Sequence, residues 1–241
     1  EGEVIIYAGT DPASAATWSL IGVFRTGKPI GRRCAVKYGG DLLILTQDGA
    51  VFLRTIMQLA IDQAAARAIT AQINPLFNDY VRSGSSLFGW EAFLYPLGTM
   101  LILNAPQTDG TKHQIVINTI TAAPCRFKKM NAFCWGLLNG DPYFGINTKV
   151  MKSDTGTTDD GAAVDGDLVT AFSMMNTLKK KSFKLIEPVF ESNGIPPNVA
   201  LDMNVDYQLA APTGVAVASS SGGSTWGVGL WGVATWGTLK T

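Results

Sequence analysis

Residues 38–54, YGGDLLILTQDGAVFLR, contain the clearest structural signal in the chain. Residues 42–45 are a continuous apolar run, which is typical of a strand buried on both faces. Asp48 and Gly49 form a turn signal, because glycine readily adopts a positive φ. Residues 50–53 return as a second apolar segment. The stretch predicts a β-hairpin whose first strand lies in the interior.

Upstream of this hairpin the sequence predicts three further strands, at residues 3–9, 19–27 and 34–38. Residues 11–18, DPASAATW, predict a turn, because Asp-Pro followed by small residues cannot continue a ladder of hydrogen bonds. Gly27, Lys28 and Pro29 are expected to end the second of these strands.

Downstream, residues 56–74 are rich in alanine and glutamine and predict one helix. Its apolar residues recur at helical spacing at Ile61, Ala65, Ala68, Ile69, Ile73 and Leu76. Pro75 disfavours helical geometry at the preceding residue and is expected to end the helix. Residues 83–89, SGSSLFG, are expected to form a loop.

From residue 90 onward the pattern is again that of strands separated by turns. Strand-like segments are residues 91–97, 99–106, 113–122, 126–138, 143–153, 182–192 and 199–209. Residues 155–167 predict a polar loop, and residues 168–178 are ambiguous between strand and helix. Gly-Asp pairs at residues 40, 140 and 166 precede apolar runs, but their unequal spacing does not by itself establish a propeller.

These segments predict an all-β fold, mainly antiparallel, with one short helical insertion around residues 56–74. We expect a β-rich domain over residues 1–218, followed by a Ser/Gly linker and a Trp-Gly repeat over residues 219–241. The 241 residues are enough to bury a sizeable core, as one β-rich domain or two smaller ones.

Composition indicates a surface that partners cover. Only 16% of the residues are charged, while glycine is abundant at 26 residues, whereas a monomer in solution normally exposes more charge. The alternative interpretation is an ordinary neutral β-protein. The 19 basic and 19 acidic residues cancel, which disfavours tight binding to DNA.

Cys34, Cys125 and Cys134 are odd in number and have no CxxC spacing. We therefore expect neither a disulfide framework nor a zinc site, but reduced, buried thiols in a protein assembled in the cytoplasm. No apolar run approaches the ~18 residues of a membrane span, and we find no signal peptide. The chain begins at Glu1 within a strand-like run, so we expect a processed product or a fragment of a longer chain.

Motifs of enzymes are absent from the sequence. His113 is the single histidine, and a Ser-His-Asp triad would have to use it; we interpret it as a histidine at the surface or at a strand entry. GxSxG, HExxH, GxGxxG and GxxxxGK[ST] do not occur. We expect no enzyme, and no catalytic, cofactor-binding or metal-binding residue.

Two charged clusters admit a functional and a structural interpretation. Five acidic residues could supply oxygen ligands to calcium but lack the spacing of an EF-hand, so we interpret them as a solvated loop. They are Asp154, Asp159, Asp160, Asp165 and Asp167. Lys179, Lys180 and Lys181, with Lys184 nearby, are weak candidates for contacts with DNA phosphate. The favoured alternative is a solvated strand edge on which lysines discourage stray pairing.

Trp226, Trp231 and Trp236 are spaced five residues apart in the C-terminal repeat. An odd spacing places successive side chains on opposite faces of an extended strand. Each indole buries ~150–250 Å², so both faces would need to be covered. We consider the three tryptophans candidate inter-subunit contacts; docking on their own domain is the equally weighted alternative.

Several segments, in this order, resemble the tail-tube (nozzle) proteins of short-tailed bacteriophages and together cover most of the chain. They are residues 9–34, 38–54, 89–106, 130–145, 159–167 and 179–194, and the terminal Trp-Gly repeat. None is a catalytic motif. The match resembles the C-terminal portion of family members, which are commonly much longer.

The resemblance implies a fold built from β-propeller-like blades, of which this chain supplies some or all. It implies a ring of six copies below the portal and adaptor that extends the conduit for DNA. Implied partners are other copies of the chain, adaptor or head-to-tail connector proteins, tail fibre or spike proteins, and passing DNA that is not bound sequence-specifically. The implied location is the tail of the virion, after assembly in the host cytoplasm.

Two other functions are weighed against this one. A carbohydrate- or receptor-binding β-domain of a virion would stack sugars on exposed tryptophans; clustering of Trp18, Trp90 or Trp135 in an open pocket would favour it, and burial would disfavour it. A propeller-type hydrolase would need convergent acids or a histidine at a channel mouth, and the single His113 makes it remote.

Overall fold

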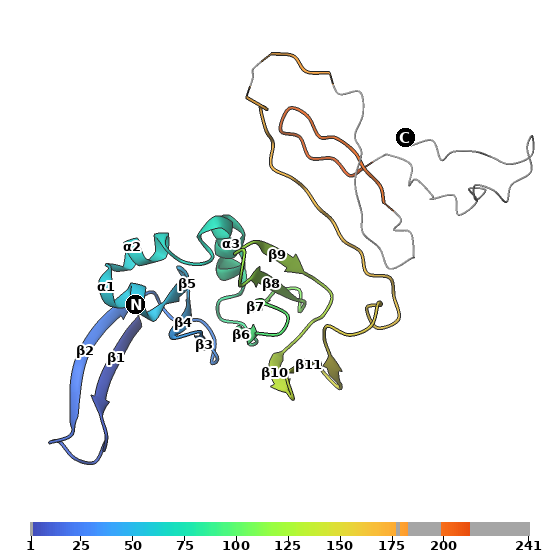
Figure 1. Cartoon of the computed structure of the whole chain (residues 1–241). Helices are drawn as coiled ribbons and strands as arrows, with labels where there is room; N and C mark the ends of the chain where they lie inside the picture. The colour runs from blue at the N-terminus through green and yellow to red at the C-terminus, as the bar shows by residue number, and fades with distance from the viewer. Residues whose placement is uncertain (1, 177–178, 183–198, 213–241) are drawn as a thin grey trace, which may run out of the picture. The chain divides into compact units, whose positions relative to one another are not determined.

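The computed structural model describes residues 2–176, 179–182 and 199–212 (Figure 1). It divides into two units, Glu1–Ala163 and Val164–Thr241. All helices and strands of the described residues lie in the first unit. The predicted domain boundary at residue 218 falls outside the described residues and stays a prediction.

The strands of the first unit form four antiparallel sheets, each an up-and-down succession of neighbours in sequence. The strands are β1 (Gly2–Gly9) and β2 (Trp18–Thr26); β3 (Ala35–Tyr38), β4 (Asp41–Thr46) and β5 (Gly49–Phe52); β6 (Glu91–Tyr95), β7 (Met100–Pro106), β8 (Lys112–Asn118) and β9 (Pro124–Phe127); β10 (Cys134–Leu138), β11 (Asp141–Gly145) and β12 (Val150–Lys152). The predicted all-β, antiparallel class is confirmed. The part of the chain that the structure describes closes neither a barrel nor a propeller.

The hairpin predicted at residues 38–54 is confirmed as β4 and β5. Leu43, Ile44 and Leu45 are all buried, as expected of a strand covered on both faces. Thr46 pairs with Gly49, so the two turn residues are 47 and 48, one residue earlier than the turn signal indicates.

The β6–β9 sheet is buried on both faces because its strands alternate between two cores. Leu101 and Leu103 of β7 belong to the cluster that also contains Phe77 and Trp90. Ile102, between them, belongs to a second cluster with residues of β10 and β11. Successive strand residues point to opposite faces, so this one sheet joins the helices and β3–β5 on one side to the β10–β12 sheet on the other.

The single helix predicted over residues 56–74 is wrong. The chain forms α1 (Leu53–Gln58), α2 (Ile61–Ala66), a 3₁₀ turn (Ala71–Ile73) and α3 (Asn74–Gly84). Tertiary contacts divide the segment: the Ile69 N–H donates to the Ala50 carbonyl (2.9 Å) and the Ala50 N–H donates to Thr70 Oγ1 (3.2 Å). These bonds tie residues 69–70 to β5 and interrupt the helical ladder.

Pro75 begins a helix rather than ending one. It lies in the first turn of α3, where the missing N–H would have no intrahelical partner and the fixed φ suits the helix. The loop predicted at residues 83–89 begins at the end of this helix, after Gly84.

Other element predictions need correction. Residues 143–153 do not form one strand, because the chain reverses after β11 and returns as β12, which pairs with it. Residues 126–138 do not form one strand: Lys129 (φ 74°) and Asn131 (φ 51°) adopt left-handed backbone and separate β9 from β10. Residues 199–209 contain no strand; alternation of side chains by itself does not form a strand without a hydrogen-bonded neighbour. Residues 168–176 are neither strand nor helix. The strand predicted at 182–192 lies outside the described residues, apart from residue 182.

Candidate functional site

The most unusual surface of the first unit is the β1–β2 hairpin, which extends away from the other sheets (Figure 1). It is a sheet of two strands, so within the described residues neither outer edge has a strand partner. An isolated two-stranded hairpin is marginally stable in water, and its open edges can pair with another chain.

The base of the hairpin is anchored by apolar contacts. Val4 and Phe24 face each other across the strands and pack on the cluster that contains Ile44, Val51 and Ile56. The Phe24 ring also covers Gly22, where a Cβ would lie 2.9 Å from the ring edge. The inner face of the hairpin is therefore held to the body through its first few residue pairs.

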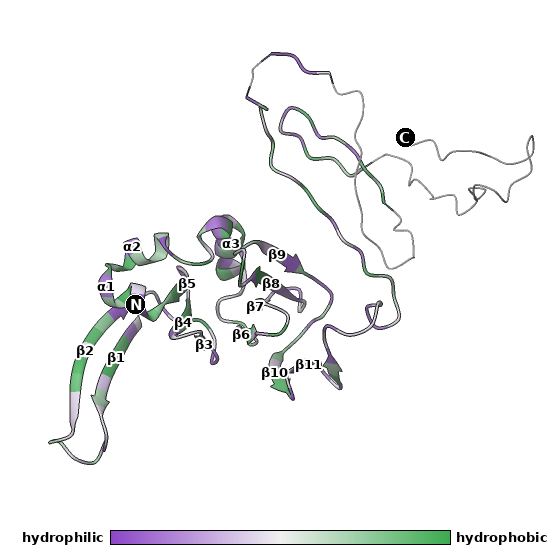
Figure 2. Cartoon of the chain, in the orientation of Figure 1, coloured by the Kyte–Doolittle hydropathy of each residue, from purple (hydrophilic) through white to green (hydrophobic). Residues whose placement is uncertain are grey.

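The outer face of the hairpin is apolar and exposed. Ile5 pairs with Val23 and Tyr7 pairs with Leu20, and the members of each pair share a face of the hairpin. A register shift between Ile6 and Tyr7 leaves one residue of β2 without a partner, which brings Leu20 to the same face as Val23. The four side chains are 49–53% exposed. Trp18 continues this face by stacking on Tyr7, with ring centroids 5.9 Å apart and planes at 10°. These five residues are called the arm face below, and Figure 2 shows the hydrophobic character of both strands.

Few charged side chains accompany the arm face. Residues 2–26 contain only three charged side chains, Glu3, Asp11 and Arg25, and Glu3 and Arg25 lie opposite each other at the base. Contiguous apolar surface of this kind on a protein in solution marks interaction sites. Beside β2, an open groove of about 550 Å³ runs along residues 56–62 and exposes Met57.

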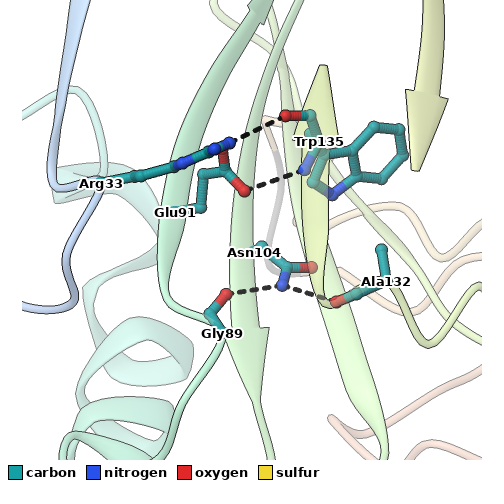
Figure 3. A network of polar contacts seen from close by, with 6 residues as sticks. All are labelled: Arg33, Gly89, Glu91, Asn104, Ala132 and Trp135. Carbon is teal, nitrogen blue, oxygen red and sulfur yellow. Dashed lines mark hydrogen bonds and ion pairs between the residues drawn. The ribbon is translucent and has the colours of Figure 1, made fainter. Parts of the chain in front are cut away.

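A buried carboxylate ties three segments of the first unit together (Figure 3). Glu91 of β6 accepts a hydrogen bond from Arg33 Nη1 (2.9 Å) and another from the Trp135 N–H (2.9 Å). Arg33 Nη1 also donates to the Trp135 carbonyl (3.1 Å). The hydrogen bond and negative charge of Glu91 raise the pKa of Arg33. Each oxygen of the Glu91 carboxylate accepts a hydrogen bond from another segment. We therefore interpret Glu91 as a structural residue.

A second buried network fixes two loops against β7. Asn104 Nδ2 donates to the carbonyls of Gly89 (2.7 Å) and Ala132 (2.8 Å), and Asn104 Oδ1 accepts from Gln114 Nε2 (2.8 Å). Asn104 and Gln114 are fully buried, so these bonds satisfy the Asn104 amide and Gln114 Nε2, which would otherwise be costly to bury. Gln114 Oε1 has no hydrogen-bond partner among the described residues. No motif in the sequence marks this network, because its residues come from segments far apart in the chain.

His113 is the second residue of β8, which confirms the prediction of a strand-entry histidine. Its Nδ1 lies 2.9 Å from Tyr80 Oη, and Arg126 Nη1 donates to the same oxygen (3.4 Å). Burial lowers the pKa of His113, and the charges of Arg126 and Lys128 lower it further. In the neutral tautomer that carries its proton on Nε2, His113 Nδ1 accepts a hydrogen bond from the Tyr80 hydroxyl. The contacts of this group are to tyrosine and arginine, and they do not compose a triad.

Of the residues predicted as candidate contacts, the structure describes the three lysines but not the three C-terminal tryptophans. Lys179 and Lys180 are exposed and Lys181 is half-buried, all in the second unit. Trp226, Trp231 and Trp236 lie outside the described residues. Their roles in DNA contact and subunit contact stay predictions.

The acidic cluster is dispersed in the structure. Asp154 accepts a hydrogen bond from Tyr95 (3.0 Å), and the remaining four aspartates are exposed. Within residues 2–176, 179–182 and 199–212, no three His, Cys, Asp or Glu side chains come together in a way that could hold a metal ion.

All three cysteines are free thiols, but the expectation that they are buried is wrong for two of them. Cys34 is half-buried, whereas Cys125 and Cys134 are exposed. Cys125 lies on β9 and Cys134 on β10, which are edge strands of their sheets. No helix of the described residues is long and apolar enough to cross a membrane.

Trp90 and Trp135 are buried and do not form an open sugar platform, whereas Trp18 is half-buried and stacks on Tyr7. Trp90 is 2% exposed and donates its Nε1–H to the Gly84 carbonyl (2.7 Å). Trp135 is 3% exposed and packs in the other cluster, between Phe93 and Phe144. Burial of these two side chains disfavours carbohydrate binding by the criterion set from the sequence.

No protein-family model, no curated protein and no solved structure matches the chain. Function is therefore inferred from the residues and the geometry above. The arm face is the surface that sequence patterning missed. Its strands were predicted, but alternation along a strand does not reveal whether another layer covers the outer face.

Proposed function

We propose that this chain is a non-enzymatic structural subunit of the tail of a short-tailed bacteriophage, and that it assembles into a homo-oligomeric ring. The ring would form part of the tube, or nozzle, through which DNA leaves the particle. The observation that carries the proposal is the exposed apolar arm face of the first unit. The ordered resemblance of residues 9–194 to nozzle proteins supports it.

The arrangement of the sheets supports the proposal that the chain contains blades of a β-propeller. β3–β5, β6–β9 and β10–β12 are consecutive antiparallel meanders of three, four and three strands. Propeller blades are four-stranded meanders that follow one another along the chain. We infer that these sheets are blades, and that the longer members of the family complete the propeller with further strands.

The proposed mechanism is geometric and electrostatic. A rigid ring holds a passage open, and a protein with no net charge gains little from releasing counterions of DNA. Weak attraction lets the duplex slide, with Lys179–Lys181 as transient contacts. Contacts to neighbouring copies, connector proteins and tail fibres or spikes would come from apolar and aromatic surface, including the C-terminal tryptophans.

Electron microscopy and light scattering on the purified whole chain test this proposal. We expect a ring of several copies, six by the family resemblance, with a central channel wide enough for duplex DNA. Binding to duplex DNA should be weak and should change little with salt concentration. A monomer at every concentration, or a protein that turns over a small molecule, would overturn the proposal.

A further inference from the structure

We propose that Arg126 and Lys128, at the β9 side of the β6–β9 sheet, contact phosphates of the DNA that passes through the ring, and that protonated His113 strengthens this contact. These three residues are called the β9 cluster below. The inference rests on the proposed function, because it assigns one DNA-facing surface of the ring. That surface belongs to the first unit, whereas Lys179–Lys181 belong to the second.

The β9 cluster lies in a part of the sequence that carries only positive charge. Residues 110–140 contain no aspartate and no glutamate, although the whole chain has no net charge. The basic residues of this stretch are Lys112, His113, Arg126, Lys128 and Lys129. A local excess of positive charge is the feature by which a protein surface attracts the phosphates of nucleic acid.

The register of the sheet brings the cluster to one face. Ile115 of β8 pairs with Arg126 of β9. Continuing this antiparallel register by two residues places Lys128 opposite His113. Side chains two residues apart share a face of a sheet, so all three members of the cluster lie on the face where Ile115 packs in the core.

Tyr80 of α3 positions the arginine and the histidine of the cluster. Figure 1 shows α3 beside β9, and Arg126 Nη1 donates a hydrogen bond to Tyr80 Oη (3.4 Å). The same oxygen lies 2.9 Å from His113 Nδ1. Tyr80 is buried, whereas Arg126 and Lys128 are exposed. An arginine that is already held in place loses less conformational freedom when it binds a ligand.

No carboxylate pairs with Arg126 or Lys128 in the part of the chain that the structure describes. The acidic residues of the adjoining elements have other partners. Asp109 accepts hydrogen bonds from the Thr111 N–H (2.9 Å) and hydroxyl (2.6 Å). Asp79 of α3 lies 3.9 Å from Arg82. The charge of Arg126 and Lys128 is therefore available to an anionic partner.

The spacing of the two cations suits a phosphate backbone. Residues two apart in a strand are ~6.6–6.8 Å apart, and each DNA strand carries a phosphate every ~3.4 Å along the helix axis. Arg126 and Lys128 can therefore contact different phosphates of one strand. Contacts with phosphates read no base sequence, which suits a surface along which DNA of any sequence slides.

Protection of a sheet edge is the alternative role for these cations. β9 is an edge strand, and charged side chains on an edge discourage pairing with another chain. That role predicts aggregation when the charges are removed. Contact with DNA predicts a loss of affinity for DNA, and only this role involves the protonation state of His113.

His113 should make the contact depend on pH. The groups that face it are Tyr80 from α3, Arg126 and Lys128 from β9 and the residue after it, and Asp109 from the turn before β8. Burial, Arg126 and Lys128 lower the pKa of His113, and Asp109 acts in the opposite direction. A phosphate beside the two cations offsets their repulsion and favours the protonated imidazole. DNA binding should therefore strengthen as the pH falls.

Fluorescence anisotropy of a labelled DNA duplex with the assembled whole chain at low salt tests the contact. We expect Arg126→Gln combined with Lys128→Gln to weaken binding at least about fivefold, for duplexes of any sequence alike. Arg67→Gln combined with Lys149→Gln is the matched control, because both residues are exposed cations of the first unit. That control should change affinity less than about twofold. Arg126→Lys should keep most of the affinity, because it keeps the charge.

The pH dependence gives a second, independent readout. The original protein should bind the duplex more tightly at about pH 5.5 than at about pH 7.5. His113→Gln should bind like the original protein at the higher pH and should gain less affinity at the lower pH. An equal gain in both proteins would show that His113 takes no part and would overturn the proposal.

Other results would also overturn it. These are equal affinities of the two double variants, aggregation of the β9 variant with unchanged affinity, and an original protein that binds no duplex at low salt. Competition by polyglutamate as strong as that by unlabelled DNA would indicate an acidic protein partner instead. Each of these results leaves the proposed ring standing, whereas an original chain that forms no ring in electron micrographs contradicts the proposed function itself.

Discussion

Glu91 shows how one residue holds distant segments of this fold together. Its carboxylate is buried and accepts from Arg33, 58 residues away, and from the Trp135 backbone, 44 residues away. Arg33 has an exposed side chain, so water can replace Glu91 as its partner. The Trp135 N–H is buried and has no such substitute, which puts most of the cost of losing Glu91 at that group.

Replacing Glu91 by glutamine should lower the free energy of unfolding by about 2 kcal/mol. The amide keeps the shape of the side chain but turns an N–H₂ group toward one of the two donors. Urea denaturation of the purified protein measures the difference. Asp79→Asn is the control, because Asp79 and Arg82 are exposed and 3.9 Å apart, and that change should stay within about 0.5 kcal/mol. Equal effects of the two substitutions would contradict the structural role of Glu91.

His113 should make stability depend on pH below neutrality. Its pKa in the folded protein is lowered from 6.5 by burial and by Arg126 and Lys128, while Asp109 acts in the opposite direction. The unfolded chain therefore binds the proton more readily, so stability is full above pH 6.5 and falls as the pH decreases through the folded-state pKa.

The comparison of the original protein with His113→Gln isolates this contribution, because the chain has no other histidine. Urea denaturation at about pH 7.5 and about pH 5.5 should show a smaller loss of stability in the variant. The imidazole resonances should titrate below pH 6.5 in the folded protein. A titration midpoint above 6.5 would show that the Tyr80 and Arg126 contacts are not formed as described.

At the scale of elements, the two-residue turns between paired strands depend on residues that can adopt a positive φ. Leu138 pairs with Asp141, so Asn139 and Gly140 form a two-residue turn, with φ values of 54° and 88°. Both residues have the positive φ that a type I′ turn requires, which is why an Asn-Gly pair suits this position. Tyr38 pairs with Asp41 around Gly39 and Gly40, a two-residue turn in which only Gly39 has a positive φ (59°).

Gly140→Ala should destabilise the protein by about 1 kcal/mol, because alanine is strained at a φ of 88°. The added methyl group would also press on Leu97. Gly40→Ala is the matched control in the β3–β4 turn, where no atom lies within 4 Å of the added Cβ and φ is not positive. We expect that change to be neutral or slightly stabilising in urea denaturation. A larger loss for Gly40→Ala than for Gly140→Ala would refute this assignment of the turns.

At the scale of the whole molecule, the first unit contains what a cooperative domain needs. Its three hydrophobic clusters and all described helices and strands lie before residue 164. The β6–β9 sheet contributes to two of those clusters through its two faces, which couples the helices to the β10–β12 sheet.

A chain ending at Ala163 should consequently unfold in one cooperative transition, with a urea midpoint close to that of the full chain. The dependence of the free energy of unfolding on urea concentration should scale with the surface that the first unit newly exposes on unfolding. Circular dichroism and tryptophan fluorescence should report the same midpoint, because Trp90 and Trp135 lie in different clusters. A broad or probe-dependent transition would mean that residues after 163 complete the core.

Local patterns predicted the elements that depend mainly on neighbours in sequence. The strands at residues 3–9 and 19–27, the turn between them and the β4–β5 hairpin all follow from alternation, apolar runs and turn residues. The helix at 56–74 was predicted too long, because hydrogen bonds from residues 69–70 to β5 interrupt it. Residues 199–209 alternate like a strand, but a strand also needs a partner edge. The networks of Glu91 and Asn104 join segments too far apart in sequence for any spacing to reveal them.

The sequence by itself determined an antiparallel β-protein with no enzymatic motif, few charges and no net charge, because side-chain type and spacing act over a few residues. Only the tertiary structure decided which apolar faces are covered. Trp90 and Trp135 became core because sheets and loops close over them, whereas Ile5, Tyr7 and Leu20 stayed exposed because the hairpin has no second layer on that face. Whether an apolar face is buried depends on which segments from elsewhere in the chain pack against it. Local sequence patterns do not report those contacts, which form only in the folded chain.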